Sequence, residues 1–150
     1  MKNLFLDSGI EEFRLTPNGE PLRFNPGDPN VYARFMELTP KIKTVETEMA
    51  EKAKKIDPNA DGSGESVLMV MRETDKRMKE ILNEIFGHGN DFDKILEGIN
   101  LMAVASNKKR IISNLLESLY PIMEEGARNC VDSEVDAAKL NREQRRAMGI

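Results

Sequence analysis

The residues of this 150-residue chain whose spacing comes nearest to a chemical site are oxygen donors in its middle. Donors at alternate positions, with glycine at the sixth, form the entry half of a calcium-binding loop. The chain has this pattern at Asp57, Asn59, Asp61 and Gly62. A calcium loop also needs a glutamate at its twelfth position, where this chain has Leu68. The same residue types favour turns, so a flexible linker between two helices is the competing interpretation.

Outside this segment, no residues combine into a catalytic or metal-binding pattern. His88 is the only histidine, which excludes a multi-histidine metal site or a histidine-based triad within one chain, and we interpret it as a solvated turn residue. Cys130 is the only cysteine, so no internal disulfide can form, and we interpret it as an unreactive thiol of a reducing cytoplasm. We therefore predict that the protein is not an enzyme and binds no cofactor.

Length and composition are typical of one modest domain. Of the residues, 39% are hydrophobic and 32% are charged, with a formal net charge of -4. An acidic balance opposes a general role in binding nucleic acid or anionic membranes. No apolar run approaches the roughly 18 residues of a membrane span, and the first seven residues do not form a signal peptide. These features predict a soluble intracellular protein.

The first elements expected along the chain are a β-hairpin and a helix. In residues 10–24, Phe13 and Leu15 share one face, and Leu22 and Phe24 share another, across a Pro- and Gly-containing turn. Because an isolated hairpin is only marginally stable, it should lie on a helical surface or pair with a strand of another subunit. A breaker cluster follows, in which Asp28 can cap a helix that begins at Pro29.

A long amphipathic stripe follows the hairpin. Its apolar residues recur in steps of three and four, at Val31, Phe35, Leu38, Ile42, Val45, Met49 and, after a gap, Ile56. Pro40 should kink this helix or split it at Thr39, which could cap the second part. The stripe faces either the core or a partner. If it is a partner surface, replacing Phe35 and Leu38 together by Asp should abolish assembly or partner binding.

Three further helical patterns complete a mainly α fold of four to five helices. One stripe runs from Val67 to Ile85 and should end in a left-handed cap at Gly87. Asp91 can cap a helix extending to Met102, and Asn107 can cap another over 111–123, bent at Pro121. We expect one domain over residues 1–131 and, because large apolar residues become sparse, a flexible polar tail over 132–150.

Two features of the sequence could contribute to partner binding. The tail carries several positive charges within about two helical turns, at Lys139, Arg142, Arg145 and Arg146. They could dock an acidic partner or, less readily, nucleic acid, or they could form a solvated charged tail. The nine methionines could mark an adaptable binding face or could simply fill the core.

The order of these pieces resembles a family of small phage proteins. The resemblance spans nearly the whole chain and comprises the hairpin ending in Phe24-Asn25-Pro26, a long charged helix, a helix ending in Ile85-Phe86-Gly87, the segment 114–122 (NLLESLYPI), and the closing segment 140–146 (LNREQRR). In this order they resemble the tail assembly chaperones of long-tailed bacteriophages and prophages of Gram-positive bacteria.

The resemblance implies a function without catalytic residues. Such a chaperone keeps the tape measure protein soluble in the cytoplasm of the bacterial host, helps to recruit tail tube subunits, and is absent from the finished virion. Together with the apolar stripes, it predicts a homo-oligomer that binds these partners through helical surfaces, with candidate contacts at Val31, Phe35, Leu38, Ile42, Val45, Met49, Arg142, Arg145 and Arg146. Two alternatives stay open, a structural tail or connector component retained in the virion, and a helical regulator whose basic tail contacts nucleic acid.

Overall fold

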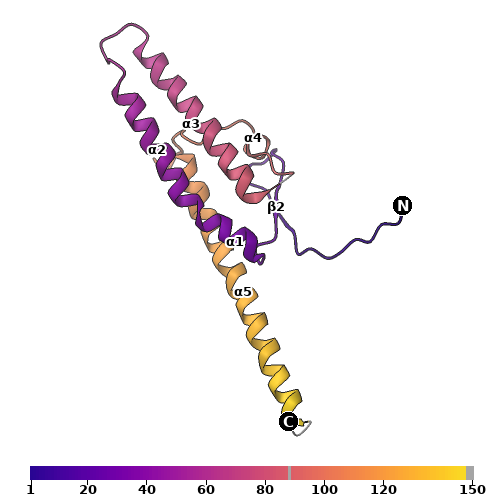
Figure 1. Cartoon of the computed structure of the whole chain (residues 1–150). Coiled ribbons are helices and arrows are strands. Elements are labelled where there is room, and N and C mark those ends of the chain that lie inside the picture. Colours follow the sequence, from indigo (N-terminus) through magenta and orange to yellow (C-terminus); the bar gives the residue numbers. More distant parts are fainter. Residues whose placement is uncertain (88, 148–150) are drawn as a thin grey trace.

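The computed structural model describes residues 1–87 and 89–147, without the side chains of residues 137, 140, 141, 143 and 145. The fold is mainly α, with a small antiparallel hairpin near the N-terminus, as the sequence predicts (Figure 1). The predicted turn role of His88 lies outside the described residues. Residues 1–10, which we call the arm, form no strand or helix and extend away from the body (Figure 1).

The hairpin lies on the helical surface, as one of the two expected arrangements requires. Strand β1 (Glu11–Phe13) pairs antiparallel with β2 (Leu22–Phe24), and Glu11 is opposite Phe24. The ring centroids of Phe13 and Phe24 are 5.0 Å apart, and those of Phe24 and Phe86 are 4.9 Å apart. The two strands therefore turn their aromatic residues toward the same side, where a helix covers them.

The outer edge of β2 is closed by one side chain. The backbone N–H of Arg23 donates to Asn90 Oδ1 at 2.9 Å, and Asn90 Nδ2 donates to the carbonyl oxygen of Arg23 at 2.8 Å. The buried Asn90 side chain thus takes the place of a third strand. It satisfies the N–H and carbonyl groups of Arg23, which would otherwise be removed from water without a hydrogen-bond partner.

The helix that follows begins as predicted but breaks earlier. Helix α1 (Pro29–Met36) has Asp28 as its N-cap, and the Asp28 side chain accepts a hydrogen bond from the Asn30 N–H. Helix α2 (Leu38–Lys54) begins after Glu37, so the prediction that Thr39 caps the second helix is wrong. Pro40 lies in the first turn of α2, where its missing N–H costs no helical hydrogen bond.

Helix α3 (Ser63–Phe86) packs alongside α2 to form a helical hairpin (Figure 1). It ends where predicted, at Gly87, whose φ of 85° favours glycine and whose N–H donates to the Asn83 carbonyl oxygen. The predicted left-handed cap is wrong in conformation, because the ψ of Gly87 is -174°. The last two turns of α3 supply much of the core, through Met78, Ile81, Leu82, Ile85 and Phe86.

The helix expected from Phe92 to Met102 is only one turn long. Asp91 caps α4 (Phe92–Ile95) as predicted, but Glu97 and Gly98 have positive φ values of 51° and 74° and end it. A loop follows, and it returns Leu101 and Met102 to the core.

Asn107 does not cap the next helix, contrary to prediction. Its side chain accepts from the Lys109 N–H and pairs with the amide of Asn114, while Lys108 has a non-helical φ of 68°. The helix therefore begins only at Ile111.

Helix α5 (Ile111–Ala147) is the longest element, and it continues through Pro121. Its first half packs into the body and buries Ile112, Leu115, Leu119 and Met123. Its second half projects beyond α1 (Figure 1). The two halves meet at Gly126, where a Cβ atom would lie 2.0 Å from the carbonyl oxygen of Pro26. Only glycine permits this approach of α5 to the loop before α1.

We expect Gly126→Ala to lower the free energy of unfolding by about 1–3 kcal/mol, because the added methyl group must displace a backbone carbonyl. Gly64→Ala is the matched control. It also lies in a helix, but a Cβ atom there would have no neighbour within 4 Å, so alanine should stabilise the protein by about 0.4–1 kcal/mol. Urea denaturation of both variants measures the difference, and equal effects would contradict the close approach at Gly126.

Candidate partner-binding surfaces

The apolar stripe predicted as a partner surface is filled by the chain itself. Its first five residues are 0–7% exposed and belong to the core, namely Val31, Phe35, Leu38, Ile42 and Val45, and Met49 is half-buried beside them. The candidate contact role of these side chains is therefore corrected to packing, since helices α3 and α5 cover the stripe within the monomer.

The calcium-loop candidate is a turn at the tip of the α2–α3 hairpin. Asp57, Asn59 and Asp61 are all exposed, and the Asp57 carboxylate accepts a hydrogen bond from the Asn59 N–H. Within the described residues, no three or more His, Cys, Asp or Glu side chains are grouped to hold a metal ion. The Asp57 side chain is thus used in turn chemistry, which is what the linker interpretation expects.

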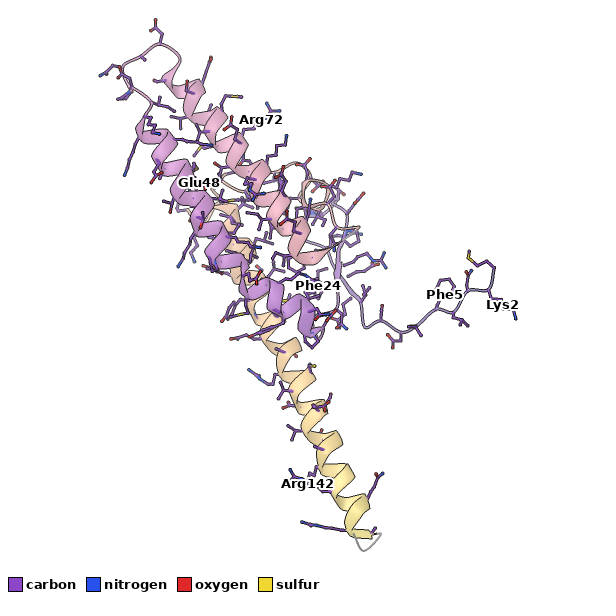
Figure 2. All side chains as sticks on the ribbon, in the orientation of Figure 1. Lys2, Phe5, Phe24, Glu48, Arg72 and Arg142 are labelled. Atoms are coloured by element: carbon purple, nitrogen blue, oxygen red, sulfur yellow. The ribbon has the colours of Figure 1, made fainter. Side chains whose placement is uncertain are left out.

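The predicted flexible tail is helical up to Ala147. Residues 131–136 are all exposed, as is Arg142, which lies far along α5 (Figure 2). Arg146 is exposed as well, whereas the Arg145 side chain is outside the described set. The basic residues therefore lie on an extended helix that stands clear of the body.

This projecting half of α5 carries a narrow apolar stripe that was not among the predicted partner surfaces. Val131 and Val135 are 60% and 59% exposed, one helical turn apart. With their neighbours they recur at steps of four, four and three, and we call the set the α5 stripe, composed of Ala127, Val131, Val135 and Ala138. The spacing was visible in the sequence, but these side chains are too small to stand out among charged residues.

An apolar groove lies where the α5 stripe meets the body. It has a volume of about 190 Å³. Three sides are formed by the loop before α1, by α1 and by α5, and almost all of its lining is carbon. We call it the apolar groove, lined by Pro26, Gly27, Asp28, Pro29, Tyr32, Ala127, Cys130 and Val131.

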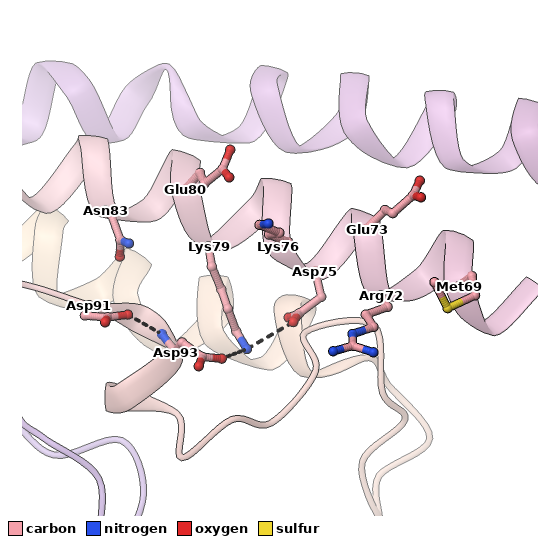
Figure 3. Close-up of a pocket in the computed structure, with 10 residues that line it drawn as sticks. All are labelled: Met69, Arg72, Glu73, Asp75, Lys76, Lys79, Glu80, Asn83, Asp91 and Asp93. Atoms are coloured by element: carbon pink, nitrogen blue, oxygen red, sulfur yellow. Dashed lines mark hydrogen bonds and ion pairs between the residues drawn. The ribbon is translucent and has the colours of Figure 1, made fainter.

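A larger hollow of about 500 Å³ lies between α3 and α4. At its floor is Lys79, whose Nζ lies 2.8 Å from Asp93 Oδ1 and 3.0 Å from Asp75 Oδ2 (Figure 3). The other oxygen of Asp75 accepts from the Leu101 N–H at 2.7 Å. Lys79 and both carboxylate oxygens of Asp75 thus tie α4 and the following loop to α3, so we assign this cluster a structural role.

Comparison of the chain with protein-family models, with curated protein sequences and with solved structures found no match. Among the helices of the described part of the chain, none is long and apolar enough to cross a membrane.

Proposed function

We propose that this protein is a non-enzymatic tail assembly chaperone of a long-tailed phage or prophage. It binds the tape measure protein in the cytoplasm of the bacterial host and helps to recruit tail tube subunits. The observation that carries the proposal is the projecting half of α5, a helix with an exposed apolar stripe and a basic end. The order of sequence pieces that resembles this chaperone family supports it independently.

The α5 stripe fits a helical partner. Its residues repeat at the spacing that brings one face of a helix against another, and the crossing helix would cover Val135 and Ala138. Because the stripe contains only valine and alanine, the contact area per turn is small. A chaperone must let its client go when the tail assembles, and a narrow stripe provides a contact weak enough to reverse.

The basic end of α5 would orient the partner helix in this contact. Arg142 and Arg146 are exposed one turn apart, beyond the stripe. They would attract acidic residues of the partner helix and set its direction, since charged groups at the rim of an interface mainly affect association rate and register.

The test is co-expression of the chain with the tape measure protein encoded near it, with soluble yield and co-purification as readouts. We expect the wild-type chain to raise soluble yield and Val135→Asp to lower the affinity roughly 10–100-fold, the value of one buried valine. Ser133→Asp is the matched control, because it adds the same charge on the opposite side of α5 and should leave binding unchanged. Circular dichroism should show that both variants remain folded.

Two results would overturn the proposal. One is a wild-type chain that neither solubilises nor co-purifies with the tape measure protein. The other is retention of the chain in purified virions, read by mass spectrometry, which would favour a structural tail component instead.

A further inference from the structure

The arm exposes three adjacent large apolar side chains. Leu4, Phe5 and Leu6 are 87–91% exposed, and Figure 2 shows Phe5 and Lys2 far from the body. The chain has six phenylalanines, and the other five pack against one another around Phe86. Three adjacent large apolar residues held in water are unfavourable, so a partner surface that buries them is expected.

The apolar groove has the size and lining to receive such side chains. Its volume of about 190 Å³ is below the roughly 300–1,000 Å³ that is typical of small-molecule sites. It is therefore suited to one or two inserted side chains rather than to a cofactor. Asp28 is its charged lining residue, and Glu134 lies one turn beyond Cys130 on the same side of α5.

The root of the arm is fixed to the wall of the groove. Asn25 Nδ2 donates to the carbonyl oxygen of Ser8, and Asn25 Oδ1 accepts from the Gly27 N–H. Gly9 has a φ of +69°, and a Cβ atom there would lie 2.7 Å from Asn25 Nδ2, so the chain turns here in a conformation that glycine favours. This turn directs the arm away from α5 (Figure 1). In this arrangement, the arm lies outside the groove of its own chain.

We propose that the Leu4–Leu6 segment of one copy inserts into the apolar groove of a second copy, and that two copies exchange arms in this way. Lys2 then approaches Asp28 and Glu134, so charge as well as apolar character is complementary. Two exchanged arms carry two phenylalanines and four leucines. Because one phenylalanine buries about 150–250 Å², the two exchanged phenylalanines together bury about 300–500 Å², and the leucines and the covered grooves add to this area.

The test is a disulfide between differently tagged copies. The donor copy carries Leu6→Cys and Cys130→Ser, and the acceptor copy keeps Cys130, the sole natural cysteine, in its groove. Under mild oxidation we expect a donor–acceptor disulfide at least ten times more abundant than with a control donor carrying Leu68→Cys and Cys130→Ser. Leu68 is 66% exposed and lies near the start of α3, away from the groove.

A second measurement does not depend on thiol chemistry. In sedimentation equilibrium, the wild-type chain should be a dimer or larger, and Phe5→Asp should dissociate it without altering its helical content. Equal cross-linking by the two donors, or a wild-type chain that is monomeric, would overturn the proposal. So would a disulfide that forms only within one chain carrying Leu6→Cys and Cys130, because the arm would then occupy its own groove. None of these measurements involves the tape measure protein, so the outcome is independent of the proposed function.

Discussion

Replacing Phe35 and Leu38 together by aspartate is expected to unfold the protein. Phe35 is 4% exposed between Phe86 and Tyr120, and Leu38 is fully buried at the start of α2. Each substitution removes a large apolar side chain, which costs about 2–5 kcal/mol, and places a carboxylate in the apolar core. The sum exceeds about 5 kcal/mol, which is comparable with the whole stability of a typical domain. Circular dichroism and the elution volume in gel filtration should report the loss of structure.

The matched control places the same two charges one residue further along the chain. Met36 is 50% exposed and Thr39 is exposed in the first turn of α2, so the double variant Met36→Asp, Thr39→Asp should remain folded. If instead the Phe35 and Leu38 variant stayed folded and lost only partner binding, the stripe would be a partner surface after all, and the described core would be wrong.

Replacing Lys79 by methionine is expected to lower the free energy of unfolding by about 3 kcal/mol, the cost of leaving a buried charge without its partner. The side chain of Asp75 is 14% exposed and would lose the cation with which it pairs, whereas that of Asp93 is 67% exposed and would be solvated at little cost. Because Asp75 also accepts the Leu101 N–H, the loop after α4 should loosen with it. Urea denaturation measures the stability, and hydrogen exchange at Leu101 measures the local effect.

Lys76→Met is the control for this second prediction. Lys76 lies on the same helix and lines the same hollow, but it is exposed, so its replacement should change stability by no more than about 0.5 kcal/mol. Equal losses for the two variants would mean that Lys79 acts through its methylene groups rather than through its charge. If the double variant Lys79→Met, Asp75→Asn kept the stability of the wild-type protein, this result would further support the charge interpretation.

A helix boundary can be predicted from the sequence where a single residue enforces it. Asp28 with Pro29, Asp91, and Gly87 each act within one turn of the backbone, and the structure has each where the sequence predicts it. The predicted boundary at Thr39 is wrong because proline is tolerated throughout a first turn, so Pro40 alone does not specify where that turn begins. The predicted helix cap at Asn107 is wrong for a related reason, because an asparagine side chain can support a turn as readily as a helix cap.

The mainly α character, the hairpin and the apolar stripes could all be predicted from the sequence, because backbone preferences and side-chain periodicity are properties of short segments. Which stripe meets the core and which meets water depends on how distant segments pack together. The stripe from Val31 to Met49 is covered by α3 and α5, while the smaller α5 stripe and the arm remain exposed. Periodicity identifies an apolar face, but its neighbour is fixed by contacts between segments distant in sequence, such as Gly126 against Pro26, and by the total area that one chain can cover.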